Sequence, residues 1–324
     1  MLGVHAKNPG GPEQLELIDV AVPKPRKGEI LIKVHAAALN RTDIITREGK
    51  MSYLQNPILG VEVSGTVIDS NGTNFVKDEK VAGLVNGGGY AEYAVMPAER
   101  AMRIPDSFTF EEGAAIPEVF LTAYQTLFWH GRLQRRESVL IHAGGSGVGT
   151  AAIQLAKQIT GAKVMTTAGS KEKLAVCKEL GADVLINYKE ESFDHEVLKA
   201  TENQGANVIL DFIGAKYWEM NTKSISQEGR WVLIGTLGGS TVEKMNLMTL
   251  MSKCVQITGT LLTPRSDQYK ADLTKEFMDV AMPLFKQNKI KPIIDRAFSF
   301  QDVQKAHQHM EDNKNIGKII LTWD

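Results

Sequence analysis

Cysteine is scarce in this chain, and that scarcity excludes two ways of holding a small protein together. The 324 residues include two cysteines, Cys177 and Cys254. Two thiols can build neither a disulfide framework nor a four-cysteine zinc site. Cys177 falls inside a predicted helix and Cys254 directly before a predicted strand, so both are expected to be buried small residues. At roughly 100–200 residues per domain, the length predicts two domains.

An excess of one charge and long apolar runs are also lacking. Lysine and arginine total 37 and aspartate and glutamate 38, a formal net charge of −1. Without a basic excess or a basic run, the chain has little basis for nucleic-acid binding. No window approaches about 18 uninterrupted apolar residues, so no membrane span is predicted. The first residues form neither an apolar signal core nor an Arg-rich presequence, and a cytoplasmic location is expected.

The hydrophobic pattern changes near residue 118. Before it, alternating segments such as Glu29–Ala36 are separated by Gly, Pro and Asn, which is typical of strands in a small barrel or sandwich. From Ser138 onward, apolar runs of strand length alternate with amphipathic runs of helix length. This alternation predicts an α/β doubly wound parallel sheet, the dinucleotide-binding architecture. Its six predicted strands are Ser138–His142, Lys163–Thr167, Val184–Ile186, Asn207–Phe212, Trp231–Gly235 and Val255–Gly259.

After residue 262 the alternation ends. A long helix is predicted over Asp267–Asn288, then a strand near Ala297–Phe300, a helix over Val303–Glu311 and a last strand over Lys318–Thr322. Because these elements do not extend the six-strand series, we expect the chain to return to its first domain. The β-rich domain would then comprise residues 1–118 and 263–324, and the nucleotide-binding domain residues 119–262.

A glycine cluster separates the first strand of the second domain from its first helix, which is predicted from Gly147 to Thr160. Gly145, Gly147 and Gly149 lie two residues apart, which is not the G-x-G-x-x-G spacing. Glycines allow backbone to approach a pyrophosphate, and a helix start supplies free N–H groups. A flexible loop is the alternative, but the flanking strand and helix favour dinucleotide binding, with Gly147 and its neighbours on the pyrophosphate.

The residues after the second strand indicate which dinucleotide binds. NAD-binding domains place an acidic residue there, about 20 residues after the glycine cluster, to hold the ribose 2′-hydroxyl. Here Ser170, Lys171 and Lys173 follow the strand instead. A hydroxyl and ammonium groups suit a 2′-phosphate, and lysines at a helix start otherwise oppose the helix dipole. NADPH is therefore predicted, with Ser170 and Lys173 on the phosphate and Tyr188 within reach; solvated lysines and an interfacial tyrosine are the alternatives.

Several stretches, taken together, resemble one family over nearly the whole chain: the zinc-independent, zeta-crystallin-like quinone oxidoreductases of the medium-chain dehydrogenase/reductase superfamily. The stretches are Ala38–Asp43, Gly60–Val67, Ala114–Tyr124, Leu140–Leu155, Asp211–Gly214, Gly229–Gly235 and Asn313–Ile319. The resemblance implies a GroES-like catalytic domain, a Rossmann domain and a homodimer. It also implies cofactor contacts from Gly145, Ser146, Val148, Gly169, Gly235 and Lys318.

Zinc enzymes of this fold take a Cys from an early loop and a His that follows a barrel glycine. The matching positions here are the loop Leu39–Asp43 and Val61, which provide neither group, so no metal is predicted. Without a Lewis acid, an alcohol or an unactivated ketone is a hard substrate. Quinones and α,β-unsaturated carbonyls can still accept hydride, because the negative charge spreads into oxygen and the protein mainly positions the reactants.

Three residues are candidates for acting on the acceptor. Asn40 is predicted to donate a hydrogen bond to it, Asp43 to orient Asn40 or water, and Tyr53 to cap the acceptor or supply a proton. Each also has a purely structural alternative: Asn40 as a turn residue, Asp43 as a helix cap and Tyr53 as an aromatic residue of a lid. The first functional hypothesis is an NADPH:quinone oxidoreductase. The second is an enoyl or alkenal reductase, and the third a nucleotide-binding structural protein with little turnover.

The predicted sixth strand, with its continuation to Leu261, would lie at an edge of the sheet, apolar and unpaired. Exposed strand edges invite pairing. Two copies related by a two-fold axis could pair this edge with itself. A homodimer is therefore predicted from the strand as well as from the resemblance.

Overall fold

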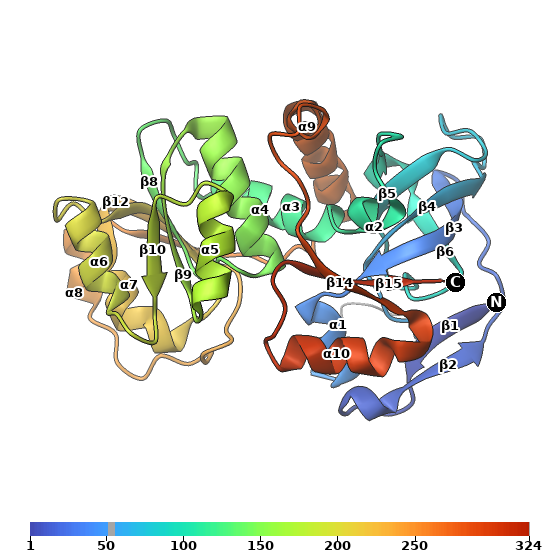
Figure 1. The fold of residues 1–324 in the computed structure, drawn as a ribbon, viewed down its shortest axis with the longest axis horizontal. Helices are drawn as coiled ribbons and strands as arrows, with labels where there is room; N and C mark the ends of the chain where they lie inside the picture. Colours follow the sequence, from blue (N-terminus) through green and yellow to red (C-terminus); the bar gives the residue numbers. More distant parts are fainter. Residues whose placement is uncertain (51–55, 324) are drawn as a thin grey trace. The chain divides into compact units, whose positions relative to one another are not determined.

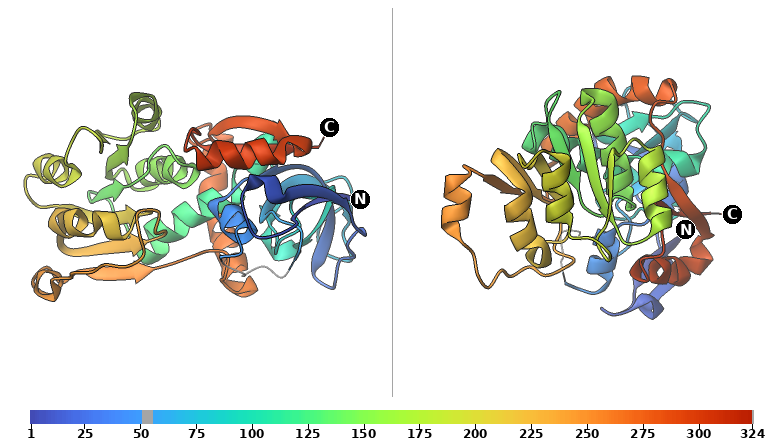
Figure 2. Two further views of the ribbon diagram at one scale, coloured as in Figure 1. Left: turned by 90° about the horizontal axis from the view of Figure 1, so that it is seen from below. Right: turned by 60° about the vertical axis from the view of Figure 1, so that its left-hand side comes forward.

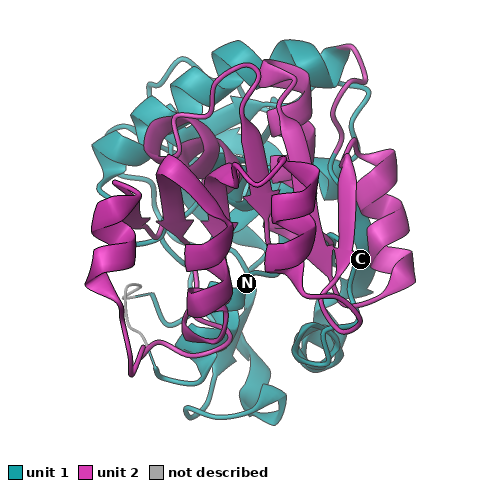
Figure 3. Cartoon of the chain, turned by 90° about the vertical axis from the view of Figure 1, so that its left-hand side faces the viewer, with its two compact units in different colours: residues 1–121, 262–286, 292–324 teal, residues 122–261, 287–291 magenta. Residues whose placement is uncertain are grey.

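The computed structural model describes residues 1–50 and 56–323 (Figure 1). The chain forms two compact units. The first comprises Met1–Leu121, Leu262–Lys286 and Pro292–Asp324, and the second Thr122–Leu261 and Gln287–Lys291 (Figure 3). The predicted domain boundaries were 118/119 and 262/263. The additional short segment of the second unit is held there by Gln154, whose amide bonds both backbone groups of Lys291 at 2.9 Å.

The main sheet of the first unit joins the early and the late parts of the chain. Among the described residues its order is β14-β15-β3-β4-β5-β7, and β6 also pairs with β3. The last strand, β15 (Lys318–Thr322), pairs antiparallel with β3 (Glu29–Ala38), with Ile320 opposite Ala38. This pairing is the predicted return of the chain.

Alternation of apolar residues explains why β3 forms a strand with one buried face. Ile30, Ile32 and Val34 are buried, and the residues between them are more exposed, as the two-residue period of a strand requires. The other strands are β1 (Leu2–Ala6), β2 (Leu15–Asp19), β4 (Glu62–Asp69), β5 (Lys80–Leu84), β6 (Tyr93–Pro97), β7 (Ala101–Arg103) and β14 (Ile294–Ser299). The helices are α1 (Arg41–Arg47), α2 (Phe110–Ala114), α3 (Pro117–Tyr124), which runs into the second unit, α9 (Asp267–Lys286) and α10 (Val303–Glu311), with 3₁₀ turns η1 (Pro12–Gln14), η2 (Ala98–Arg100) and η6 (Phe300–Asp302).

The second unit is built on a six-stranded sheet with the order β10-β9-β8-β11-β12-β13. All neighbouring strands are parallel, as predicted. The strands are β8 (Ser138–Ile141), β9 (Lys163–Ala168), β10 (Val184–Asn187), β11 (Ala206–Asp211), β12 (Ile225–Leu233) and β13 (Gln256–Gly259).

Helices cover both faces of this sheet, with α4 and α5 on one face and α6 and α7 on the other (Figure 2). The strand order reverses between β8 and β11, which is the switch point where dinucleotides bind in such sheets. The helices are α4 (Gly147–Leu155), α5 (Lys171–Glu179), α6 (Phe193–Ala200), α7 (Trp218–Ser224) and α8 (Leu247–Ser252), with the π-helical turns η3 (Gln125–His130) and η4 (Ala156–Thr160) and the 3₁₀ turn η5 (Ala215–Tyr217).

Two predictions for the second unit need correction. The helix expected from Gly147 to Thr160 is α-helical only to Leu155 and continues as the π-helical turn η4. Cys254 is exposed rather than buried, because it follows α8, whose side chains largely face solvent, and precedes the edge strand β13. Cys177 is fully buried, as predicted, and burial raises the pKa of its thiol to about 12.

In the part of the chain that the structure describes, no helix is long and apolar enough to cross a membrane.

Candidate functional site

The glycine turn after β8 requires glycine for steric reasons. A Cβ on Gly149 would lie 2.4 Å from the carbonyl oxygen of Ala143, and one on Gly144 would lie 2.1 Å from Oγ1 of Thr166. Both distances are far below any real contact. The turn therefore places the start of α4 directly against the end of β8 and beside β9, as a dinucleotide-binding turn does.

The first turn of α4 presents backbone N–H groups. Ser146 is the N-cap, and its Oγ accepts a hydrogen bond from the N–H of Gly149 at 3.0 Å. The N–H of Thr150 bonds the carbonyl of Ser146 at 2.9 Å. The N–H groups of Gly147 and Val148 belong to the first turn, where an α-helix supplies no acceptor from its own backbone. With the positive end of the helix dipole, they fit a pyrophosphate.

The residues predicted to hold the 2′-phosphate gather beside this turn. A Cβ on Gly145 would lie 3.0 Å from Cβ of Lys173, and a Cβ on Gly169 would lie 2.5 Å from the hydroxyl oxygen of Tyr188. Ser170 is the N-cap of α5, and its Oγ accepts the N–H of Lys173 at 3.3 Å. The structure therefore brings Gly145, Gly169, Ser170, Lys173 and Tyr188 together at the carboxyl ends of β8, β9 and β10.

Gly235 lies two residues beyond the end of β12, at the same edge of the sheet. A Cβ at this position would lie 3.1 Å from the carbonyl oxygen of Phe212, which follows β11. The predicted cofactor residues of the second unit thus share one edge, where the carboxyl ends of the parallel strands meet.

Sequence reasoning missed a buried polar network behind the glycine turn. The carboxylate of Asp211, at the end of β11, accepts the side-chain N–H groups of Asn221 and Trp231, each at 3.1 Å, and two backbone N–H groups. Asn221 also bonds Nε2 of His142 at 2.8 Å, and Nδ1 of that ring bonds Thr167 at 3.0 Å. Burial lowers the pKa of His142. In the sequence, the charged Asp211 directly after the apolar run Val208–Leu210 could have indicated this network.

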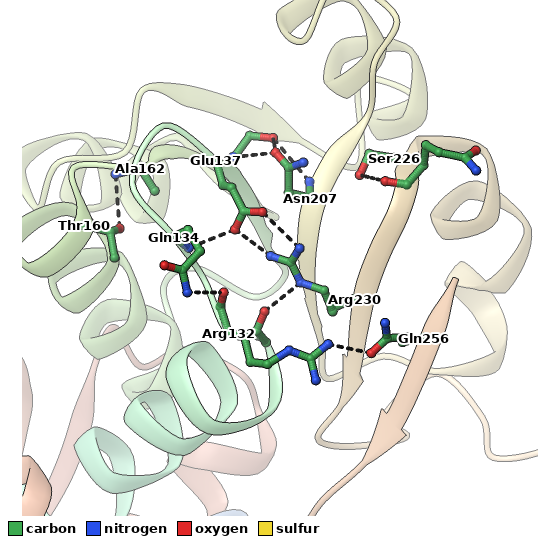
Figure 4. Close-up of polar contacts among 12 residues, drawn as sticks. Arg132, Gln134, Glu137, Thr160, Ala162, Asn207, Ser226, Arg230 and Gln256 are labelled. Carbon is green, nitrogen blue, oxygen red and sulfur yellow. Dashed lines mark hydrogen bonds and ion pairs between the residues drawn. The ribbon is translucent and has the colours of Figure 1, made fainter. Parts of the chain in front are cut away.

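A cavity of about 470 Å³ in the second unit lies away from this edge. Glu137 accepts two hydrogen bonds from Arg230, at 3.0 and 2.5 Å, and Arg132 donates to Gln256 at 2.5 Å (Figure 4). These contacts join the segment before β8 to β12 and to the start of β13, and the arginines are paired internally. We therefore regard the region as structural; its lining residues are Arg132, Gln134, Glu228, Arg230, Cys254 and Gln256.

The first unit contains a buried ion pair next to the predicted catalytic loop. Nζ of Lys318 lies 2.7 Å from Oε1 of Glu62, and the exposed fractions of the two side chains are 4% and 0%. The same ammonium group donates to the carbonyl of Leu39 at 2.6 Å and to Oδ1 of Asn40 at 2.8 Å. Lys318 was predicted to contact the cofactor, but its three protons are committed to these three oxygens.

Asn40 is fully hydrogen-bonded within the protein. Its side-chain Nδ2 donates to the carbonyl of Ala38 at 3.2 Å and to Oε1 of Glu62 at 2.7 Å, while Oδ1 accepts from Lys318. A direct hydrogen bond from the Asn40 amide to an acceptor would require one of its two donor contacts to break. In this geometry Asn40 supports Glu62 and Lys318.

Asp43 caps the helix that follows Asn40. Its Oδ2 accepts the backbone N–H of Asn40 at 2.8 Å and the hydroxyl of Tyr90 at 3.1 Å. Oδ1 is buried and has no hydrogen-bond partner among the described residues. Burial raises the pKa of Asp43 to about 7, and burial together with Asp43 raises that of Tyr90. Asp43 therefore orients Asn40 through the backbone. Tyr53, the third predicted residue, lies outside the described residues.

Glu118 is a further titratable group of this cluster, and sequence reasoning gave it no role. It lies in the first turn of α3, and its backbone N–H donates to Oε2 of Glu62 at 2.7 Å. Burial, then the charge of Glu62, raise the pKa of the Glu118 carboxyl group to about 8. A glutamate within the otherwise apolar stretch Ala114–Leu121 was the signal that could have identified it.

Known protein families match parts of both units. Residues 26–106 match the family model of the alcohol dehydrogenase GroES-like domain, and residues 147–278 match that of the zinc-binding dehydrogenases. Quinone oxidoreductase of Pongo abelii is 30% identical over 321 residues, which cover 96% of this chain and 94% of that protein.

Two solved structures are similar over the whole chain. An NAD-dependent alcohol dehydrogenase superposes with a TM-score of 0.90 at 29% identity, with 100% of both chains covered. A mycobacterial protein complexed with NADPH superposes with a TM-score of 0.89 at 27% identity, with 99% of each chain covered.

The GroES-like first unit, the doubly wound second unit and the glycine turn define a medium-chain dehydrogenase/reductase with a fold that binds NAD(P). Within that superfamily the chain belongs to the quinone oxidoreductase family. One matching family model is named for zinc binding. In residues 1–50 and 56–323, however, no group of three or more His, Cys, Asp or Glu side chains is placed to hold a metal ion.

Proposed function

We propose that this protein is an NADPH-dependent, zinc-independent oxidoreductase that transfers hydride to quinones. The observation that carries the proposal is the position of Ser170, Lys173 and Tyr188 beside the glycine turn, in a chain related to a quinone oxidoreductase over 96% of its length. A dinucleotide bound to the α4 N-terminus would place its adenosine ribose toward the end of β9. There a hydroxyl and an ammonium group can hold a 2′-phosphate.

The bound cofactor would supply a hydride from its nicotinamide ring. The chain would hold the pyrophosphate through the backbone of Ser146, Gly147 and Val148, and the 2′-phosphate through Ser170 and Lys173. Quinones suit a site built without a Lewis acid, because the charge that develops on the acceptor spreads into its oxygens.

A second candidate activity is the reduction of enals or enones. The raised pKa of Glu118 supports it, because such a reaction must protonate a carbon atom after hydride transfer, and a carboxyl group with a pKa of about 8 is protonated at neutral pH. A quinone requires such an acid less, because its reduced oxygen can take a proton from solvent.

Steady-state oxidation of NADPH with a panel of quinones, enals and enones tests both candidates. Turnover with quinones in the presence of a chelator supports the first proposal. Turnover restricted to enals supports the second. Tight NADPH binding without turnover of any acceptor would contradict both and favour a nucleotide-binding structural protein. One zinc ion bound per chain, and lost together with activity, would contradict the proposal that the enzyme is zinc-independent.

A further inference from the structure

We infer that His142 and Thr167 are positioning residues of the dinucleotide site, because buried hydrogen bonds through their side chains hold the glycine turn against the end of β9. The inference deepens the proposed function and rests on the part of it that concerns dinucleotide binding. The hydrogen bonds form one network, hereafter the Asp211 network, which lies entirely in the second unit and consists of the side chains of Asp211, Asn221, His142 and Thr167.

The His142 ring is enclosed behind the glycine turn. His142 directly follows β8, precedes Gly144 by two residues and is 0% exposed. Its ring packs edge-on against Phe193 and Tyr217, with centroid distances of 4.7 and 4.8 Å. Its backbone N–H donates to the carbonyl of Leu210 in β11 at 3.1 Å. A ring that is this enclosed cannot contact a bound dinucleotide, so it can affect binding only through other residues.

The hydrogen bonds of the Asp211 network have one direction. Nδ2 of Asn221 donates to Oδ2 of Asp211 at 3.1 Å, because a carboxylate can only accept. A flipped amide would turn its oxygen toward the carboxylate, and the two acceptors would repel each other. Oδ1 of Asn221 therefore faces His142, and it accepts the proton of Nε2 at 2.8 Å.

The same reasoning assigns the tautomer of His142. With its proton on Nε2, the neutral ring presents Nδ1 as an acceptor, and the hydroxyl of Thr167 donates to it at 3.0 Å. Burial lowers the pKa of His142, which agrees with a neutral ring. Every donor of the network thus points toward Asp211, which is fully buried. Because each group has a single role, one arrangement satisfies all of them, and the network holds its members in place.

Thr167 connects the Asp211 network to the glycine turn. Its hydroxyl bonds the ring of His142, and its backbone carbonyl accepts the N–H of Gly144 at 2.9 Å. β9 is therefore bonded to the segment after β8 through a side chain and through the backbone. Thr167 also precedes Ser170, the N-cap of α5, by three residues. Its position sets the spacing between the turn, which would hold the pyrophosphate, and Ser170, which would hold the 2′-phosphate.

Asp211 connects the network to two further loops at the same edge of the sheet. Its Oδ1 accepts the backbone N–H groups of Ile213 and Gly214, at 2.7 and 3.0 Å, in the loop after β11. Its backbone carbonyl accepts the N–H of Ile234 at 2.7 Å, directly after β12 and before Gly235. The network therefore bonds the carboxyl ends of β8, β9, β11 and β12, which lie on both sides of the switch point.

The spacing of these loops matters because the expected ligand contacts come from the backbone. Backbone N–H groups at a helix start bind a phosphate only where they already point toward it. A site that is ordered before binding loses less conformational freedom when the ligand arrives. Without the network, the turn and the end of β9 would have to be ordered on binding. NADPH and NADH both contain the pyrophosphate, so both should bind more weakly.

The first test is Thr167→Val, with the dissociation constants of NADPH and NADH measured by calorimetric titration. Valine removes the hydroxyl donor and keeps the branched side chain and the backbone carbonyl. We expect both constants to rise by about tenfold, as for the loss of one hydrogen bond that holds the site in place. A group that contacted only the 2′-phosphate would instead affect NADPH alone.

Thr126→Val is the matched control. Thr126 is also 0% exposed and lies in the second unit, and its hydroxyl donates to the carbonyls of Thr122 and Ala123 in its own helical segment. This variant should lose stability in urea unfolding, while its dissociation constants for both dinucleotides stay at the wild-type values. Equal losses of affinity in the two valine variants, or no loss in Thr167→Val, would overturn the inference.

His142→Phe tests whether Thr167 acts through the imidazole ring. Phenylalanine keeps an aromatic ring against Phe193 and Tyr217 but removes both nitrogens, so both dinucleotides should bind at least as weakly as to Thr167→Val. The double variant should bind them no more weakly than His142→Phe alone, because the hydroxyl has already lost its partner. Losses that add up in the double variant would contradict the inference.

Nitrogen-15 NMR of the protein without cofactor tests the direction of the network. The signals of His142, identified by their absence in His142→Phe or, if that variant does not fold, in His142→Gln, should show a protonated Nε2 and an unprotonated Nδ1. A proton on Nδ1 alone, or on both nitrogens, would overturn the inference. A wild type that binds neither dinucleotide would contradict the proposed function as well, whereas wild-type affinity in both Thr167→Val and His142→Phe would contradict this inference alone.

Discussion

Nζ of Lys318 lies 2.7 Å from Oε1 of Glu62, in a pair that joins the last strand of the first unit to β4. Both side chains are almost fully buried, so the pair is held in a medium of low dielectric. Removal of both charges from water is costly, and it is offset by their mutual attraction and by the further oxygens that surround the ammonium group. The pair therefore fixes the geometry of the cluster more than it adds net stability.

Replacement of one partner should be much more harmful than replacement of both. Lys318→Met would leave the Glu62 carboxylate buried without its counter-charge, and we expect a loss of about 3–5 kcal/mol in the free energy of unfolding. Glu62→Met combined with Lys318→Met should lose less than the single variant. Urea unfolding measures both, with Lys314→Met, an exposed position, as the control. A double variant less stable than Lys318→Met would contradict this account.

Asn40→Ala should slow the reaction without weakening cofactor binding. The variant removes a donor to Glu62 and an acceptor from Lys318, so the cluster that carries Glu118 loses its geometry. We expect turnover with the preferred acceptor to fall by up to about 10²-fold, as for a small displacement of groups that position the reactants. The dissociation constant of NADPH should remain nearly constant in fluorescence titration. Weaker NADPH binding with unchanged turnover would show that Asn40 serves the cofactor.

Lys173→Met should discriminate between the two nicotinamide cofactors. A charge-assisted hydrogen bond to the 2′-phosphate contributes about 1.5–3 kcal/mol, so NADPH affinity should fall by roughly 10–150-fold, while NADH affinity stays nearly unchanged. Calorimetric titration with both dinucleotides measures this. Lys178→Met, in the last turn of the same helix, is the matched control. Equal losses for NADPH and NADH would remove the phosphate assignment.

As the pH rises, the wild type should lose stability relative to the variant Asp43→Asn, because of the titration of Asp43. Burial raises the pKa of Asp43 from 3.8 to about 7. The folded protein then binds this proton more tightly than the unfolded chain does, so stability is greatest below pH about 4 and decreases until pH about 7. The slope for one group is about 1.4 kcal/mol per pH unit.

The measurement is the difference in the free energy of unfolding between the wild type and Asp43→Asn at several pH values. Comparison with the variant cancels other groups, including His307, whose pKa is lowered by burial to about 3. The difference should change between pH 4 and 7 and then level off. A difference that is constant across this range would show that Asp43 is ionised when folded.

Self-association through β13 remains a prediction. β13 is the edge strand of its sheet, and the adjoining α8 exposes Met248 and Met251 by 65% and 67%. Light scattering should give the mass of a dimer. Gly259→Glu should shift the protein toward monomer, because an added Cβ there meets no atom within 4 Å, whereas two-fold pairing would bring like charges together. Ala21→Glu, an exposed position in the first unit, is the control, and an equal effect of both variants would count against β13.

Elements with a strong apolar period could be predicted from the sequence. The order of alternating strands and helices in the second unit, helix α10 and strand β15 follow from local patterns. Buried strands such as β8 and β15 are short apolar runs, and α10 buries residues at helical spacing. The glycine turn was also predictable, since a strand, glycines and a helix occur in direct succession. The positions of Ser170 and Lys173 followed from that turn.

The roles of single polar groups could not be predicted in the same way. Asn40 was expected to face the acceptor, but its amide is satisfied by Ala38 and Glu62, a residue 22 positions away in sequence. The burial of Asp211 and the raised pKa of Glu118 likewise depend on which distant groups surround them. Hydrogen-bond partners and dielectric surroundings are tertiary properties, and residue type and spacing do not determine them.

The insertion of β15 between β14 and β3 has a consequence for how the chain is synthesised. A ribosome produces β3 about 280 residues before its partner β15. Residues Glu29–Lys33 of β3 can pair with β6 early, but Ala36–Ala38 must wait for β15 until almost the end of translation. The second unit lies between them in sequence and can fold first. Lys318 arrives with β15, so the buried carboxylate of Glu62 can find its counter-charge only in the final stage of synthesis. We expect chaperones that shield unpaired strands to matter more to this protein's yield than to that of a chain whose sheets close in order.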